Sequence, residues 1–312
     1  LVLRSILESA KSVFKIRGLS SSLTVKYGSS SEEQEDSVAV PASAKLMDTS
    51  ILDYAFARNA IAAVCLLAVL SGVVGTYVVV RRMVFSAGGV THASFGGIGL
   101  AYYAGFDPTL GALAFAVACA LGINVATERG GVRTDSAIAM LWSLGMAVGV
   151  IFMSLTPGYA PNLMGFMFGD VLAVSRADVL ASGALAIVVV ALAVIFYRPL
   201  LYTSFDPTYA QVAGWRPRLV SGIASVIMAL AISLSIKAVG IILVLSVFTM
   251  PQAIALCFVH TLPCVMIFSG LVALIGCAAG LALSFLFDLP SGAVITALLS
   301  VALIIIKLSR RG

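Results

Sequence analysis

The sequence predicts an all-α integral membrane protein, a polytopic bundle of eight or nine membrane-spanning helices in which some segments are short or broken. Of the 312 residues, 61% are hydrophobic and 11% are charged, whereas an ordinary soluble domain has about 25% charged residues. The apolar residues gather in runs that approach the length needed to cross the hydrocarbon core, about 20 residues of helix. A soluble fold of this size could not bury so much apolar surface.

The first 50 residues differ in composition from the rest of the chain. Serine clusters at 20–22 and 29–31 and the acidic run at 32–36 are typical of a disordered tail, and residues 1–16 are weakly amphipathic. The segment lacks the long apolar core and the cleavage site of a secretory signal. We therefore expect a disordered or weakly amphipathic tail over 1–50, without an assigned function, and a transmembrane domain over 51–312.

The spans follow one another with short connections. Their predicted ranges are 56–80, 88–105, 108–126, 137–155, 178–197, 219–236, 239–258, 264–286 and 291–308. Some are shorter than a full crossing, and residues 157–175 are a candidate for a segment that enters the membrane without crossing it.

The charged connections predict an orientation. Ten basic residues fall on one side: Arg81, Arg82, Arg129, Arg133, Arg198, Arg216, Arg218, Lys307, Arg310 and Arg311. Outside the tail, the other side has Arg58, Arg176 and Lys237. The positive-inside rule places the ten in the cytoplasm, with the C-terminus inside and the N-terminus outside. The six basic residues of the tail conflict with a location outside the cell. If the tail lies in the cytoplasm, one of the predicted spans must be wrong. The basic residues lack the clustering of a nucleic-acid site.

Residues 81–99 combine glycines with one of the two histidines of the chain. The glycines are Gly88, Gly89, Gly96, Gly97 and Gly99. They favour either close helix packing or unwound backbone that lines a path. An ionisable residue at membrane depth, here His92, indicates function, and neutral imidazole binds zinc, manganese or iron. A histidine hydrogen-bonded to a neighbouring helix is the equally weighted alternative.

The longest cytoplasmic connection is expected to hold a helix of about two turns. Asp206 fits the N-cap position, Pro207 the first helical position, and Gly214 the C-terminal stop. Tyr209 and Trp215 would then be exposed to the cytoplasm. Exposed aromatic residues favour a docking site for a cytoplasmic partner, and an interfacial helix with an aromatic anchor is the alternative.

Several reaction classes lack their residues in this sequence. The phosphate-binding pattern G-x-x-x-x-G-K-[ST] is absent, so energy must come from a partner or an ion gradient. The patterns H-E-x-x-H and G-x-S-x-G are absent too, and no pair of nucleophile and base is visible for an intramembrane enzyme. Asp107, before Pro108, is expected to serve a turn rather than a metal.

Four motifs occur in the order seen in one protein family. They are the glycine-rich His92 segment, residues 169–174, residues 205–214, and Val239-Gly240 with Met250-Pro251. The chain from about 52 to 308 resembles the metal-ion permeases of ATP-binding cassette importers for zinc, manganese and iron, the ABC-3 type. Each motif alone is weak, but four in register make the resemblance specific.

The resemblance implies a permease subunit that moves a divalent metal across the inner or plasma membrane of a prokaryotic cell. It implies a permease homodimer, a cytoplasmic ATP-binding subunit that hydrolyses ATP, and an extracytoplasmic metal-binding protein. The permease would have no ATPase activity and no bound cofactor. The coupling role would fall on Phe205, Asp206, Pro207, Tyr209, Gly214 and the adjacent Trp215.

Members of that family have an aspartate four residues before the histidine, whereas this chain has Gly88. Aspartate and histidine at that spacing share one helix face and can hold a metal together. The absence of this aspartate either weakens the case for a metal site at His92 or places the second ligand elsewhere in the chain. Asp170 is a candidate for that ligand, with helix capping as its alternative role. The alternative function is a gradient-driven secondary transporter, but such carriers often place acidic residues in mid-span, and these spans have almost none.

Overall fold

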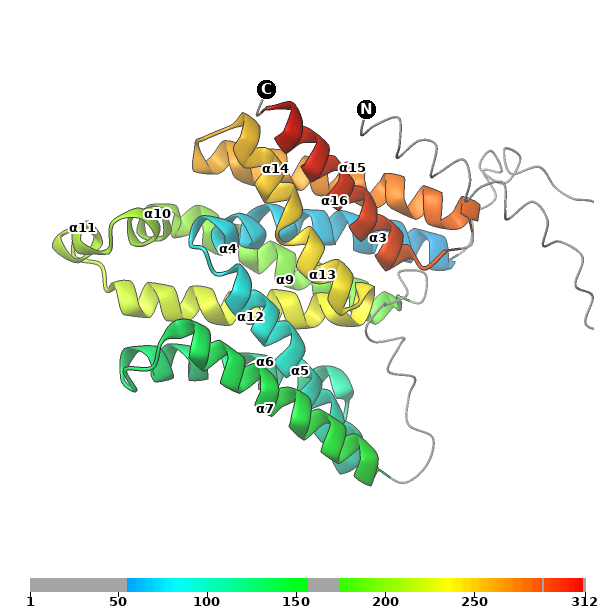
Figure 1. Cartoon of the computed structure of the whole chain (residues 1–312), viewed down its shortest axis with the longest axis horizontal. Helices are drawn as coiled ribbons and strands as arrows, with labels where there is room; N and C mark the ends of the chain where they lie inside the picture. Colours follow the sequence, from blue (N-terminus) through cyan, green and yellow to red (C-terminus); the bar gives the residue numbers. More distant parts are fainter. Residues whose placement is uncertain (1–54, 157–173, 288, 311–312) are drawn as a thin grey trace, which may run out of the picture. The chain divides into compact units, whose positions relative to one another are not determined.

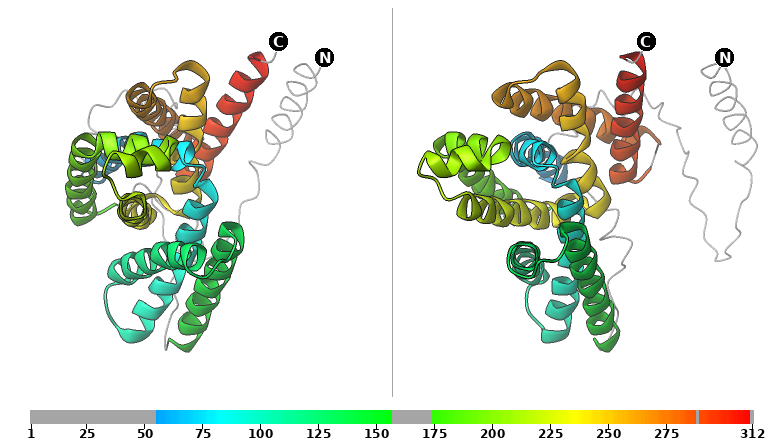
Figure 2. Two further views of the ribbon diagram at one scale, coloured as in Figure 1. Left: turned by 90° about the vertical axis from the view of Figure 1, so that its left-hand side faces the viewer. Right: turned by 60° about the vertical axis from the view of Figure 1, so that its left-hand side comes forward.

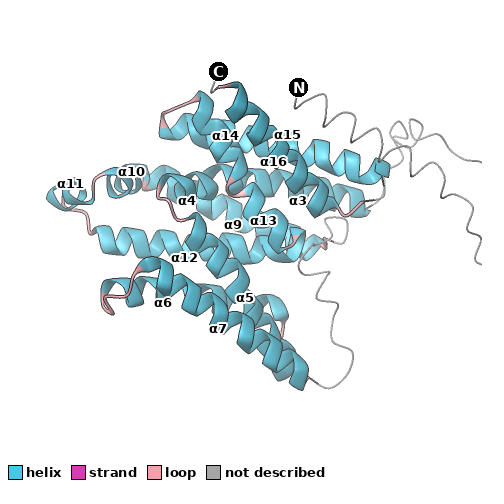
Figure 3. Cartoon of the chain, viewed as in Figure 1, coloured by secondary structure: helices cyan, strands magenta, loops and turns pink. Residues whose placement is uncertain are grey.

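The computed structural model describes residues 55–156, 174–287 and 289–310, and every element in these ranges is a helix (Figure 3). The predicted tail and Asp170 lie outside the described residues. In chain order the elements are α3 (Ala55–Leu70), the π-helical turn η2 (Ser71–Gly75), α4 (Thr76–Val80), α5 (Val84–Ala104), α6 (Pro108–Glu128), α7 (Thr134–Leu155), α9 (Arg176–Ile195), α10 (Tyr197–Phe205), α11 (Pro207–Val212), α12 (Pro217–Val239), α13 (Ile241–Val247), α14 (Met250–Phe258), α15 (Leu262–Phe287) and α16 (Ser291–Ser309) (Figure 1).

Within the described ranges, eight helical segments are long and apolar enough to cross a membrane. One combines α3, η2 and α4, and another combines α13 and α14. Helix α5 is not among the eight, although its 21 residues also have spanning length. The prediction of an all-α bundle with eight or nine spans, some of them broken, is therefore confirmed.

The connections alternate between two ends of the bundle. At one end, Arg81 after α4 donates to the carbonyl oxygen of Thr203, and Arg218 Nε lies 3.9 Å from Glu128 Oε2. This end is called the cytoplasmic end below, after the orientation that the basic connections predict. At the other, called the outer end, Lys237 Nζ lies 2.8 Å from Asp178 Oδ1. The connections α4–α5, α6–α7 and α10–α12 lie toward the left of Figure 1. The basic connections predicted to share one side thus lie together.

Helices α5, α6 and α7 pack on one another and contact the remaining helices mainly through α12 and α13 (Figure 2). Helix α15 packs against α3, η2, α14 and α16. The largest fully buried side chains include Leu70 of α3, Met228 of α12 and Phe248 directly after α13, and all three belong to one hydrophobic cluster. A continuous core therefore links the halves of the domain.

The π-helical turn is held by a glutamine far away in the sequence. Gln252 Nε2 donates to the carbonyl oxygen of Ser71 at 2.7 Å and to Ser71 Oγ at 2.9 Å, and both residues are fully buried. A Cβ at Gly75 would lie 2.3 Å from Gln252 Nε2, so only glycine leaves room for this amide. The irregular turn disturbs the regular hydrogen bonding of the helix, and the Gln252 amide donates a hydrogen bond to a backbone carbonyl oxygen of this turn.

Candidate functional site

His92 lies on α5 against Trp142 of α7. The two rings are stacked, with centroids 4.5 Å apart and planes 6° from parallel. Phe85 meets the same indole edge-on, with ring centroids 6.2 Å apart. The imidazole is thus held in one orientation by an aromatic surface.

The imidazole lines an open groove of about 560 Å³, called the His92 groove below. Its walls are mainly apolar and include Phe85, Gly88, Trp142 and Leu245, with Arg82 at its cytoplasmic end. His92 is the one lining residue of a type that binds transition metals. Over the described ranges, no group of three or more His, Cys, Asp or Glu side chains could hold a metal ion. Among the residues that the structure describes, this groove therefore offers a metal ion one imidazole and little else.

Four glycines of α5 lie in close contact with neighbouring helices, which is one of the two arrangements that the sequence favoured. A Cβ at Gly96 would lie 2.7 Å from the carbonyl oxygen of Gly145 on α7, and one at Gly97 would lie 2.0 Å from that of Gly111 on α6. Gly89 and Gly99 are equally tight against α7. Because α5 is continuous from Val84 to Ala104, the unwound-backbone alternative is wrong for this segment.

Gly88 differs from these four glycines. A Cβ there would meet the nearest atom, Leu245 Cδ1, at 3.8 Å, which is an ordinary contact distance. The position borders the His92 groove and has space for a side chain. The absence of a carboxylate at 88 is therefore not imposed by packing.

The predicted short cytoplasmic helix is present as α11. Asp206 Oδ1 accepts hydrogen bonds from the backbone N–H groups of Thr208 at 3.0 Å and Tyr209 at 2.9 Å, with Pro207 at the first helical position. Gly214 ends the segment with φ of 84°, a conformation that favours glycine. Each of these features acts within a few residues, which is why the sequence pattern was sufficient to predict them.

Three of the exposed side chains of this segment are aromatic. Phe205 is 66% exposed, Tyr209 52% and Trp215 40%, while Ala210 is fully buried beneath them. Tyr209 packs edge-on against Tyr202 of α10, with centroids 5.0 Å apart. The segment from Phe205 to Trp215, called the coupling segment below, therefore presents a preformed aromatic surface at the cytoplasmic end.

Arg81 ties the turn between α4 and α5 to the helices that flank the coupling segment. Its Nη1 donates to the carbonyl oxygen of Thr203 on α10, and its Nη2 donates to Ser221 Oγ on α12 at 3.1 Å. The following residue, Arg82, has φ of 56°, which is rare for a residue with a side chain. Sequence reasoning used Arg81 only as an orientation signal, because its partners lie more than a hundred positions away.

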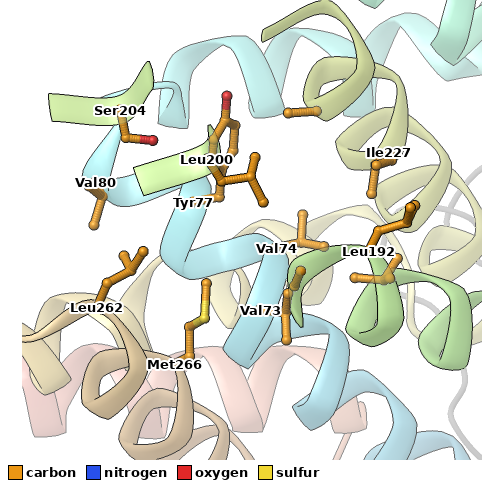
Figure 4. Close-up of a pocket in the computed structure, with 13 residues that line it drawn as sticks. Val73, Val74, Tyr77, Val80, Leu192, Leu200, Ser204, Ile227, Leu262 and Met266 are labelled. Carbon is orange, nitrogen blue, oxygen red and sulfur yellow. The ribbon is translucent and has the colours of Figure 1, made fainter. Parts of the chain in front are cut away.

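A small apolar cavity of about 50 Å³ lies beside α10 (Figure 4). Its lining comes from η2 and α4 (Val74 and Tyr77), α10 (Leu200), α12 (Ile227) and α15 (Met266), with α9 completing the wall. Helix α10, which leads into the coupling segment, therefore packs against apolar neighbours that leave a small cavity unfilled.

At the outer end the described carboxylates have structural partners. Asp107 Oδ1 caps α6 by accepting from the Thr109 backbone N–H at 2.6 Å, as the turn prediction required. Hydrogen bonds from Thr109 hold the pKa of the Asp107 carboxyl below its ordinary value. Asp178 belongs to a capping box with Ser175 and pairs with Lys237. Because of these contacts, neither carboxylate replaces the aspartate that is absent at position 88 as a second metal ligand beside His92. The role of Asp170 as that ligand remains a prediction.

The chain is similar to known proteins both in sequence and in fold. Residues 53–310 match the ABC 3 transport family. An uncharacterised membrane protein of Synechocystis is 35% identical over 260 residues, covering 83% of this chain and 92% of the relative. A manganese transport system membrane protein of Halalkalibacterium halodurans is 30% identical, covering 78% of this chain and 83% of the relative. The solved structure of PsaBC from Streptococcus pneumoniae in complex with Fab has a chain of similar fold, with a TM-score of 0.75 and 24% identity, covering 84% of this chain and 94% of that one.

Proposed function

The chain belongs to the ABC 3 transport family, and from this premise we propose that it is the membrane permease subunit of an ATP-driven importer of divalent metal ions. The observation that carries the proposal is the family match across residues 53–310, the whole helical domain. It is an integral protein of the prokaryotic plasma membrane, in keeping with the eight apolar helical segments of the described residues and with its relatives. Relatives named as manganese transport proteins make manganese the first metal to test.

The proposed route for the metal includes the His92 groove. The groove is open on one side and offers one imidazole. In a permease homodimer, two such grooves could face each other and supply two imidazoles to one passage. Sparse ligands suit a passage that must release its cargo, because tight binding would trap the ion. Affinity would then reside in an extracytoplasmic metal-binding protein.

The proposed site for the ATP-binding subunit is the coupling segment. Its exposed Phe205, Tyr209 and Trp215 are of the residue types enriched at protein interfaces. Arg81 joins α10 and α12, the helices that flank this segment, to the turn from which α5 starts. Movement of the docked partner would therefore reach α5, which carries His92, through a short chain of direct contacts. ATP hydrolysis would belong to the partner.

The test is uptake of radioactive manganese by cells or vesicles that contain the chain, an ATP-binding subunit and a metal-binding protein encoded nearby. We expect uptake only when all three are present and ATP is supplied. Zinc and iron(II) added in excess would reveal the selectivity by competition. Uptake of an organic solute without any metal by the purified complex, or uptake driven by an ion gradient without ATP, would contradict the proposal.

A further inference from the structure

A polar pocket of about 170 Å³ lies at the cytoplasmic end and shares no lining residue with the His92 groove. It is half-enclosed between the start of α5, the last turns of α6, the first residue of α7 and the first turns of α12. Its polar lining includes Arg81, Ser86, Asn124, Thr127, Ser221 and Ser225. No lining residue is acidic.

Two polar atoms in this pocket lack a partner. Ser225 Oγ and Asn124 Nδ2 are buried and have no hydrogen-bond partner among the described residues, and Ser225 is only 2% exposed. A buried polar group without a partner destabilises the fold, so such atoms normally face a bound molecule or water. Both groups can donate a hydrogen bond.

The charge of the pocket is positive. Arg81 uses one N–H of each terminal nitrogen for Thr203 and Ser221, which leaves other N–H groups of its guanidinium free to donate. Arg81 has no carboxylate within salt-bridge distance in the described ranges, where the ion pairs are Arg218–Glu128 and Lys237–Asp178. Ser221 accepts from Arg81 and keeps its own proton to donate. A half-buried cation surrounded by hydroxyl and amide donors favours an anion.

The position of the pocket limits which anion it meets. The pocket lies near the cytoplasmic ends of α6 and α12 and the starts of α5 and α7. In a membrane-spanning bundle we expect this end to lie near the lipid headgroups. The adjoining connections contain further arginines, Arg129, Arg133 and Arg216, which raise the local concentration of anions.

We propose that this pocket, framed by Arg81, Asn124 and Ser225, binds a phosphate oxyanion. The phosphate is supplied either by the headgroup of an anionic phospholipid or by free inorganic phosphate. Donation from the guanidinium, the amide and the hydroxyl groups satisfies the orphaned atoms and balances the charge of Arg81. The proposal does not depend on which solute the permease carries.

The test uses the full chain purified in detergent and stripped of lipid. Thermal unfolding and native mass spectrometry are recorded with phosphatidylglycerol, with an uncharged galactosyl diacylglycerol of the same acyl chains, and with inorganic phosphate. We expect phosphatidylglycerol to raise the melting temperature and to remain bound, and the galactolipid to do neither. An effect of inorganic phosphate alone would identify the free anion as the ligand.

Two variants make the test specific. Ser225→Ala and Asn124→Leu should each weaken phosphate or lipid binding by about tenfold, the usual effect of losing a hydrogen bond to a charged group. Ser233→Ala is the matched control, because Ser233 also lies on α12 with a buried Oγ that lacks a partner in the described part of the chain, but outside the pocket. Melting curves without ligand show whether each variant is folded. Equal affinity in wild type and both pocket variants, equal effects of the two lipids, or no effect of any phosphate would overturn the proposal.

Discussion

The cytoplasmic end and the His92 groove differ in how firmly their side chains hold one another. At the cytoplasmic end, Arg81 bonds to two helices and Asp206 caps α11 with two hydrogen bonds. In the groove, His92 rests on an aromatic ring among apolar neighbours. Under the proposed function, force would enter where the chain is tied by directional hydrogen bonds, and the cargo would pass where the walls offer few polar groups. Four predictions test this contrast.

The largest expected effect is at the coupling segment. Replacing Tyr209 and Trp215 together with alanine removes two large exposed aromatic side chains, and we expect loss of co-purification with the ATP-binding subunit. Aromatic anchors of this kind dominate interface energies. The matched control is Phe106→Ala, an exposed aromatic at the outer end, which should leave the complex intact. Retention of the ATP-binding subunit by the double variant would argue against docking at this site.

A smaller effect is expected when the hydrogen bonds of Arg81 to α10 and α12 are removed. Arg81→Gln removes the charge-assisted bonds to Thr203 and Ser221, and we expect about a tenfold fall in metal transported per ATP hydrolysed. ATP hydrolysis itself should continue, because the coupling segment is intact. Arg218→Gln is the control, since its side chain is 85% exposed and lies 3.9 Å from Glu128. Equal loss of transport and hydrolysis in Arg81→Gln would indicate a folding defect instead of a coupling role.

The third prediction concerns the His92 groove, where a substitution should increase metal affinity instead of removing a function. Gly88→Asp adds a carboxylate one helical turn before His92, where a Cβ is tolerated. We expect manganese or zinc to bind about tenfold more tightly in titration calorimetry, because the ion gains a charged ligand. Gly88→Ala controls for volume, and the gain should vanish in Gly88→Asp combined with His92→Ala. Unchanged affinity in Gly88→Asp would mean that position 88 does not reach the ion.

The smallest effect is expected for His92 alone. His92→Ala removes the imidazole from the groove, and we expect metal uptake to fall by roughly two- to fivefold, as for a weak single contact. His260→Ala, an exposed histidine between α14 and α15, is the control. A complete loss of uptake in His92→Ala, with normal folding, would show that the groove holds its cargo far more firmly than its sparse lining suggests.

The same contrast explains how much the sequence could predict. The spans follow from apolar runs, and the caps at Asp107 and Asp206 follow from residues two or three positions apart. These are local patterns. The stacking of His92 on Trp142, the bonds of Arg81 and the contact of Gln252 with Ser71, 181 positions apart, arise only after helices pack. The tight approach of Gly97 to Gly111 was predicted as a type of contact, but its partner was not.

The π-helical turn at Ser71–Gly75 sets the direction in which later residues of the same helix point. A π-type turn amounts to one extra residue in an α-helix, and each residue of an α-helix turns the chain by about 100°. Without that extra residue, Tyr77 and Arg81 would be rotated by about a quarter of a circle around the helix axis. Arg81 would then face away from Thr203. A glutamine buried in α14 thereby determines the direction in which Arg81 points, at the end of the helical segment formed by α3, η2 and α4.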